Sequence, residues 1–176
     1  EFEYIRHGTT SLIGFFEVAT GRIFPPYLNE TRGEADFCEA VSRVVETATG
    51  EKLGFVCDGL NKHKSETLVK YVAEACGIEE DLGQKGKSGI LKSLQSREDF
   101  LHDPSPPDSV CIYTKALLLD EQIEIWFGII NRKLLKRKSY TSLEEMKESI
   151  RRFIEQYNLT AHAFRWTYAG VPQLYN

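Results

Sequence analysis

The amino-acid sequence predicts an α/β fold. Short apolar runs bounded by glycine, proline or aspartate are typical of strands, and longer segments with apolar residues at helical spacing are typical of helices. The two kinds of segment alternate along the chain. With 176 residues, 41% hydrophobic and 27% charged, the chain can bury one core and has an ordinary globular composition. We therefore expect residues 1–176 to form a single domain.

The first predicted unit is a β-hairpin. Residues 11–19 form a largely apolar run that ends at Thr20 and Gly21, and residues 22–27 follow. Pro25 and Pro26 stop this second run, because proline is confined to the ends, edges and bulges of strands.

A helix, a strand and a second helix are expected next. Residues 34–49 carry apolar side chains at helical spacing and are followed by glycine. Residues 53–57 are almost entirely apolar, as expected for a strand buried on both faces, and the run ends at Asp58. Residues 65–76 repeat the helical pattern and end before Gly77, which is a typical helix stop.

Residues 77–108 interrupt the alternation. They contain four glycines and three of the six prolines, so we expect an insertion with one short helix near residues 97–101. Residues 83–88 superficially resemble a phosphate-binding loop, but only two residues separate the glycines where four are needed. We therefore predict no nucleotide binding.

The last third returns to a strand followed by helices. Residues 109–114 form the strand, and a helical stripe follows at Ile123, Phe127, Ile130 and Leu134, which we expect to face the core. A capping pattern at Thr141 and Ser142 then predicts a final amphipathic helix that continues to Tyr157.

Two acids and one histidine are candidates for a functional site. Glu124 is expected at the edge of its apolar stripe, where Gly128 would leave space for a metal ion and a phosphate; the alternative is a solvated glutamate. Asp58 follows a central strand, where α/β sheets place functional groups, but Asp58-Gly59 is also a common turn. His63 could approach the same ligands, although a surface position is favoured because no second histidine stands at ligand spacing.

The charge distribution is uneven. A net charge of −4 argues against nucleic acid, but residues 131–152 hold eight basic and three acidic side chains, a local charge of +5. The basic residues are Arg132, Lys133, Lys136, Arg137, Lys138, Lys147, Arg151 and Arg152. We expect a DNA-contacting surface there; the alternative is an ordinary solvated helix face.

Other patterns exclude further classes of protein. The four cysteines show no paired spacing and are expected to be reduced core residues. No apolar run reaches the 18 residues of a membrane span, and the charged first residues are not a secretion signal. The sequence therefore predicts a cytoplasmic protein without a membrane partner.

Six blocks of sequence carry a family resemblance that covers nearly the whole chain. Two of them are Cys57-Asp58-Gly59-Leu60-Asn61-Lys62-His63 and Gln122-Ile123-Glu124-Ile125-Trp126-Phe127; the others span residues 2–9, 18–21, 132–137 and 164–168. Together they resemble the bacterial insertion-sequence transposases of the DDE superfamily that are related to mariner elements, the "six-thirty" insertion-sequence family.

This resemblance implies a ribonuclease-H-like mixed sheet with flanking helices. It also implies a catalytic triad of two aspartates and a glutamate, two Mg²⁺ or Mn²⁺ ions, and DNA hydrolysis followed by strand transfer. The partners would be double-stranded DNA at transposon ends and target, and a second copy in a full-length homodimer. By motif, Asp58 and Glu124 would be the second and third acids and ligate metal. Arg132, Lys133, Lys136, Arg137, Lys138 and Arg165 would contact DNA.

In the family, the first aspartate ends a strand upstream of the block at residues 2–9. We therefore expect the sheet here to lack its first strand, the triad to be incomplete and this chain to be inactive alone. Residues 114–121 also depart from the family pattern. The alternative function is a non-catalytic DNA-binding or assembly remnant of a degenerate transposase.

Overall fold

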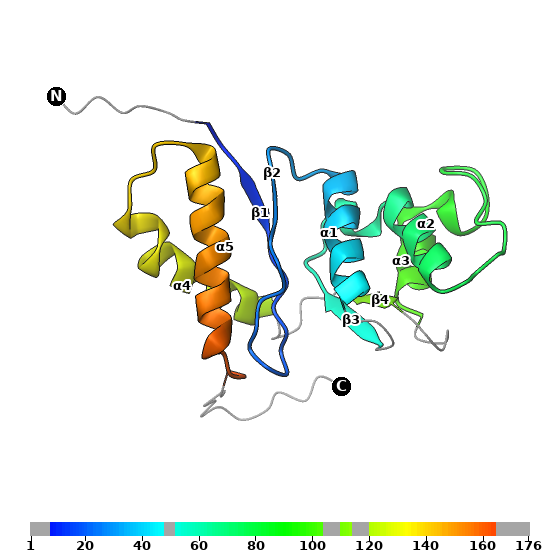
Figure 1. Cartoon of the computed structure of the whole chain (residues 1–176). Helices are drawn as coiled ribbons and strands as arrows, with labels where there is room; N and C mark the ends of the chain where they lie inside the picture. Colours follow the sequence, from blue (N-terminus) through cyan, green and yellow to red (C-terminus); the bar gives the residue numbers. More distant parts are fainter. Residues whose placement is uncertain (1–7, 48–51, 104–109, 114–119, 165–176) are drawn as a thin grey trace.

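Helices and strands follow one another in the predicted order in the computed structural model, which describes residues 8–47, 52–103, 110–113 and 120–164. The strands are β1 (Ser11–Ile13), β2 (Tyr27–Asn29), β3 (Leu53–Val56) and β4 (Val110–Tyr113). The α-helices are α1 (Glu34–Thr47), α2 (Glu66–Ala75), α3 (Leu94–Leu101), α4 (Asp120–Lys133) and α5 (Leu143–Leu159). Three short 3₁₀ helices are η1 (Asn61–Lys64), η2 (Ile90–Lys92) and η3 (Leu135–Arg137). The α/β class is confirmed (Figure 1).

The predicted hairpin is present and contains a bulge, but the predicted bounds of its second strand are wrong: β2 begins at Tyr27, after Pro25-Pro26, where the sequence predicted that the strand would stop. β1 pairs antiparallel with β2, with Ile13 opposite Tyr27, and a further bridge joins Phe16 to Ile23. Two residues separate Ile13 from Phe16, whereas three separate Ile23 from Tyr27. The extra residue falls at Pro25-Pro26, where a bulge accommodates residues that cannot donate to the ladder.

The hairpin has one hydrophobic core on each face. Ile13 and Phe15 pack against the first core, which is formed mainly by α1, α2 and β3. Leu12 and Phe16 pack against the second core, which is formed by α4 and α5. Because alternate residues of a strand point to opposite faces, the hairpin lies between two helical layers (Figure 1).

β3 and β4 form a separate parallel pair, with Leu53 opposite Val110 and Val56 opposite Tyr113. Parallel strands need a long crossover connection, which α2 and α3 provide here. Among the described residues, the four strands therefore form two sheets of two strands each. β3 ends directly before Cys57 and Asp58, so its carboxyl end carries the first candidate acid.

The segment 77–108 contains the expected short helix, α3, and contributes to the first core. Leu91 and Leu101 are fully buried in that core, and α3 lies against α2 and η1. Whether this segment is an insertion stays a prediction.

The buried face of α4 differs from the predicted stripe. Its centre is Trp126, which is completely buried, with Ile130 on one side and Gln122 on the other. Ile123 and Phe127 are only partly buried. Tryptophan has the largest apolar surface to remove from water, so its burial sets the rotation of the helix. The indole Nε1 of Trp126 and Oε1 of Gln122 have no hydrogen-bond partner in the described part of the chain.

The three cysteines whose side chains the structure describes are reduced, as the sequence predicts. Cys38 and Cys57 are buried, and both carry reduced thiols, as does Cys76. The side chain of Cys111 lies outside the described residues. None of the described helices is both long and apolar enough to cross a membrane.

Asp36 links the hairpin to the first turn of α1. Its buried carboxylate accepts hydrogen bonds from Thr31 Oγ1 (2.7 Å), the Gly33 backbone N–H (2.7 Å), Asn29 Nδ2 (2.6 Å) and Tyr27 Oη (3.1 Å). These donors, Thr31 first among them, lower the pKa of Asp36 to about 2. A carboxylate in the first turn is also favoured by the helix dipole.

We expect Asp36 to make stability pH-dependent in acid. Aspartate in an unfolded chain has a pKa of about 4, so the folded state releases this proton more readily. The contribution of Asp36 is therefore complete above about pH 4 and is lost as the pH falls towards 2. Urea unfolding of Asp36→Asn between pH 2 and 6 should give a lower stability at pH 6 and a flatter dependence on pH.

Asp99→Asn is the matched control. Asp99 is exposed on α3 and accepts a hydrogen bond from Gln95, so the variant should keep the acid dependence of the unaltered chain. An Asp36→Asn variant with the same pH profile as the unaltered chain would contradict the assignment.

Candidate functional site

Asp58 and Glu124 line the same pocket, although 65 residues lie between them in the sequence. The pocket has a volume of about 710 Å³. Asp58 reaches it from the carboxyl end of β3, and Glu124 from the first turns of α4. Residues 12–15 of the hairpin form a further wall. The fold thus brings together the two acids that the sequence selected.

Asp58 is both a turn residue and a pocket residue. Its Oδ1 accepts a long hydrogen bond (3.4 Å) from the Leu60 backbone N–H, which is the local aspartate turn that the Asp58-Gly59 pair predicts. Its side chain remains 61% exposed and is therefore accessible to a ligand. The two interpretations of Asp58 are compatible.

His63 is buried against Asp58, so the predicted surface position is wrong. The residue is only 7% exposed, and its ring lies 4.2 Å from that of Phe37, measured between centroids. Its Nδ1 is 2.8 Å from Oδ1 of Asp58 and 3.0 Å from the Asp58 carbonyl oxygen. Burial lowers the pKa of His63, and the contacts with Asp58 oppose that shift.

A sequence signal for this contact existed. Asp58 and His63 are only five positions apart, and His63 lies in the 3₁₀ helix η1 that directly follows the Asp58-Gly59 turn. The next residue but one, Ser65, caps α2 by accepting a hydrogen bond from the Leu68 N–H. A histidine held between a strand end and a capped helix has little room to turn towards solvent.

The space expected above Gly128 is occupied. A Cβ atom built on Gly128 would lie 3.1 Å from Nη1 of Arg132, because this long side chain folds back by one helical turn. Glu124 itself is exposed. Any ion that Glu124 holds must therefore lie on the pocket side of α4 and not over Gly128.

The pocket contains equal numbers of acidic and basic side chains. Arg32 and Lys62 also line it, and neither forms an ion pair with another described residue. Two carboxylates offer oxygen ligands, the kind that Mg²⁺ and Mn²⁺ prefer. No group of three metal-ligating side chains occurs in the parts of the chain that the structure describes. The two carboxylates are therefore the right kind of ligand for a hard cation, but the described residues provide fewer of them than a complete site needs.

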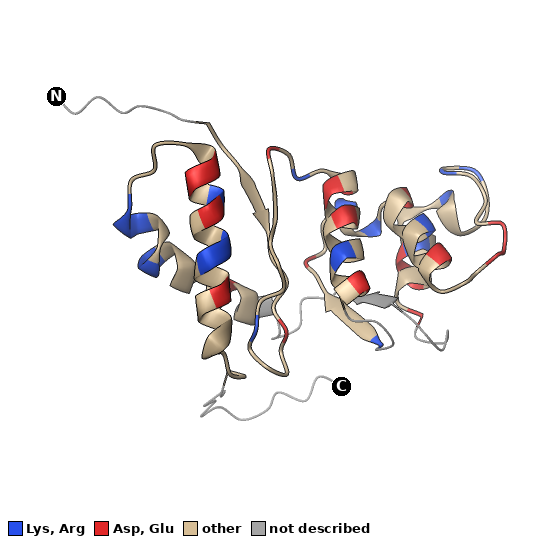
Figure 2. Cartoon of the chain, viewed as in Figure 1, with Lys and Arg blue, Asp and Glu red and all other residues tan. Residues whose placement is uncertain are grey.

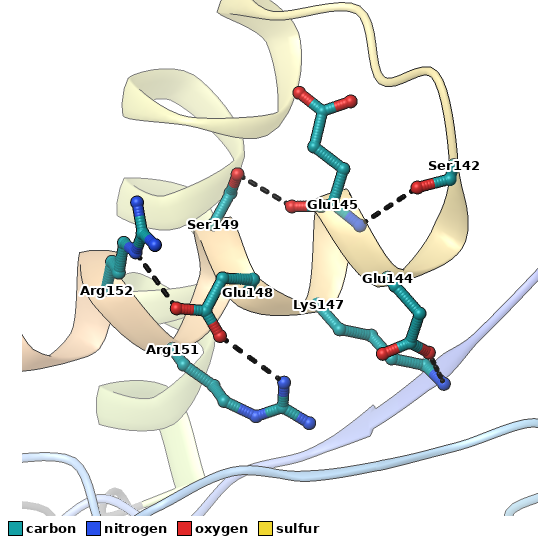
Figure 3. A network of polar contacts seen from close by, with 8 residues as sticks. All are labelled: Ser142, Glu144, Glu145, Lys147, Glu148, Ser149, Arg151 and Arg152. Atoms are coloured by element: carbon teal, nitrogen blue, oxygen red, sulfur yellow. Dashed lines mark hydrogen bonds and ion pairs between the residues drawn. The ribbon is translucent and has the colours of Figure 1, made fainter.

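The basic region is partly neutralised by its own acids. On α5, Lys147 pairs with Glu144, and Arg151 and Arg152 both pair with Glu148 (Figure 3). Lys138 pairs with Glu145. The remaining four residues, here named the basic cluster, form no ion pair with another described residue: Arg132, Lys133, Lys136 and Arg137.

The basic cluster lies at the carboxyl end of α4 and in η3 (Figure 2). α4 ends at Lys133, so Lys136 and Arg137 lie in η3 and not on the continuous helical face that the sequence predicted. Lys133 lies nine positions after Glu124, about 14 Å along the axis at 1.5 Å per residue. Arg165 lies outside the described residues.

A second cavity of about 380 Å³ lies beside the pocket. It is lined by residues 14–19 of the hairpin and residues 52–56 at β3. The pocket that contains Asp58 and Glu124 is lined by residues 12–15 of the hairpin and by residues 56–58 after β3. The two cavities therefore form a groove in which the edges of the hairpin and β3 run antiparallel to each other.

A scan against protein-family models and searches of curated proteins and of solved structures found no match to this chain. The family resemblance therefore stays a prediction from sequence motifs.

α3 supports the 3₁₀ turn that carries His63. The buried Arg97 donates from Nε to the Lys64 carbonyl (2.7 Å) and from Nη1 to the Leu91 carbonyl (3.1 Å). Lys64 Nζ also pairs with Oε2 of Glu98 at 2.9 Å, largely shielded from water. The segment 77–108 thus holds the end of η1 in place.

We expect Arg97→Met to lower the free energy of unfolding by about 1–3 kcal/mol, because it removes a charged donor from a partly buried carbonyl. Arg152→Met is the control: its ion pair with Glu148 is exposed and should contribute about 0–1 kcal/mol. Chemical denaturation at pH 7 measures both. Equal losses for the two variants would show that Arg97 does not anchor η1.

Proposed function

We propose that this chain is the catalytic region of a DDE-superfamily transposase, related to the mariner-like insertion-sequence enzymes. Its reaction would be metal-dependent hydrolysis of DNA phosphodiesters, followed by strand transfer at transposon ends. The observation that carries the proposal is the shared pocket of Asp58 and Glu124, which lie far apart in the sequence on a strand end and a helix. The six sequence blocks are the basis for proposing this family.

The residues of the pocket have separate roles in this proposal. Asp58 and Glu124 would hold Mg²⁺ or Mn²⁺, which when bound stabilises the charge on the attacking and leaving oxygens of a phosphodiester. Arg32 and Lys62 would bind the DNA phosphate, because they reach the same pocket without an ion-pair partner among the described residues. The partner is double-stranded DNA, and the full-length protein would act as a homodimer.

The groove supports the ribonuclease-H-like form of the fold. One strand inserted between the hairpin and β3, parallel to β3, would join the two pairs into a mixed five-stranded sheet. Its carboxyl end would then lie beside Asp58 and Glu124. The resemblance expects a strand that ends in the first catalytic aspartate, and this is the place that such a strand would fill.

We expect the chain as given to bind a divalent ion weakly and not to cleave DNA. The described pocket has two carboxylates, so affinity should fall at the weak end for oxygen sites, with a Kd of about 10⁻³ M. Mn²⁺ titration followed by NMR should broaden amide resonances near Asp58 and Glu124 first. Asp58→Asn and Glu124→Gln should each raise Kd by about tenfold, since each removes one anionic ligand.

Glu148→Gln provides the matched control, because Glu148 is a carboxylate on α5 whose ion pairs are exposed. This variant should bind Mn²⁺ as the unaltered chain does. The metal-site proposal would be wrong if Mn²⁺ did not broaden the amide resonances near residues 58 and 124, or if it broadened them equally in Asp58→Asn and Glu124→Gln. Mg²⁺-dependent cleavage that Asp58→Asn abolishes would overturn the expectation of inactivity.

A second candidate function is a non-catalytic DNA-binding or assembly remnant. The basic cluster favours it, because its charges form no ion pair with another described residue and lie in the last turn of α4 and in η3, beyond Glu124; Lys133 is about 14 Å from Glu124 along the helix axis. Such a surface could bind the DNA backbone, or help pair with an intact transposase, without any chemistry in the pocket.

The double variant Lys133→Gln with Lys136→Gln tests DNA binding by this cluster. If both lysines contact phosphates, the slope of log K against log salt should become less steep by about 1.8. The control, Lys147→Gln with Arg152→Gln, removes two ion-paired cations from α5 and should leave the slope nearly unchanged. DNA binding that is lost when the basic cluster is neutralised but kept in Glu124→Gln would favour the non-catalytic remnant. Equal salt slopes in the two double variants would show that the basic cluster does not contact DNA.

A further inference from the structure

His63 has contacts that a purely structural histidine does not need. Its Nδ1 faces two acceptors of the same residue, the carboxylate Oδ1 and the backbone carbonyl of Asp58. Since both are acceptors, Nδ1 must carry the hydrogen. The ring is held against Phe37, which is itself buried on α1. The donor is therefore fixed in position from two sides.

The two oxygens of Asp58 are in different environments. Oδ1 accepts from His63 Nδ1 and from the Leu60 backbone N–H. Oδ2 makes no hydrogen bond to another described residue, and the side chain lines the pocket. With Oδ1 held, the carboxylate cannot rotate without breaking the contact with a buried donor. Oδ2 is left as the oxygen available to a ligand.

We infer that His63 is a positioning residue for Asp58: it holds Oδ1 so that the carboxylate offers Oδ2 alone to a divalent cation in the pocket. The inference rests on the proposed metal site. Groups that orient a ligating side chain from behind typically change metal affinity by 10- to 100-fold when they are removed. The effect here is on orientation and requires no change in the charge of His63.

The segment 77–108 extends this support. Arg97 and Glu98 of α3 hold both the carbonyl and the ammonium group of Lys64, the residue after His63. The path from α3 through η1 to Asp58 therefore consists of directed hydrogen bonds and one shielded ion pair. In this view, the segment keeps the carboxylate aligned from outside the pocket.

Two variants of His63 separate positioning from packing. His63→Asn places an amide nitrogen where Nδ1 lies and so keeps the donor, but it loses the ring that packs on Phe37. His63→Phe keeps a ring and loses the donor. A packing role predicts that the Phe variant resembles the unaltered chain. Positioning predicts the reverse: in Mn²⁺ titrations, Kd should rise at least tenfold for His63→Phe and by less than about threefold for His63→Asn.

Thermal unfolding of the same samples checks that each variant is folded at the temperature of titration. His63→Phe should be the more stable of the two and yet bind Mn²⁺ more weakly. Equal Mn²⁺ affinity of His63→Phe and the unaltered chain, or equal weakness of both variants, would overturn the positioning role while leaving the metal site intact. If the unaltered, folded chain binds no Mn²⁺ at residues 58 and 124, the metal site fails and the inference fails with it.

Discussion

The burial of both faces of the β1–β2 hairpin is the constraint on which the rest of the structure depends. Its alternate side chains are apolar on both sides, so each face must be covered by a separate helical layer. α1 and α2 cover one face, and α4 and α5 cover the other. This arrangement brings the first turns of α4 beside the carboxyl end of β3, and the pocket forms where the two meet.

Polar contacts then fix what the packing brings together. Asp36 holds the hairpin to α1 through hydrogen bonds from Tyr27 and Asn29 of β2, and α1 supplies Phe37, against which His63 packs. His63 in turn contacts Asp58. The carboxylate in the pocket is thus connected to the hairpin by a short series of buried contacts. Glu124 is exposed, and its side chain makes no hydrogen bond or ion pair with another residue that the structure describes.

Sequence patterns succeeded where a signal is local. The hairpin, the first strand-helix alternation and the cap of α5 follow from periodicity, turn residues and capping side chains. Sequence patterns were misleading where the packing of neighbouring side chains decided the outcome. The apolar stripe of α4 did not reveal that Trp126 would set its rotation, and the glycine at 128 did not reveal that Arg132 would cover it. The position of His63 depends on Phe37, a residue of another helix.

The sequence by itself determined the α/β class and the order of the elements, because strand and helix periods and turn chemistry are properties of neighbouring residues. The choice of Asp58 and Glu124 as the acids worth testing followed from the resemblance of sequence motifs. Only the tertiary structure decided that Asp58 and Glu124 share a pocket and that His63 packs against Phe37. These outcomes depend on distances between segments that are remote in the chain, and no local pattern encodes such distances. Packing of the two cores against the hairpin sets them.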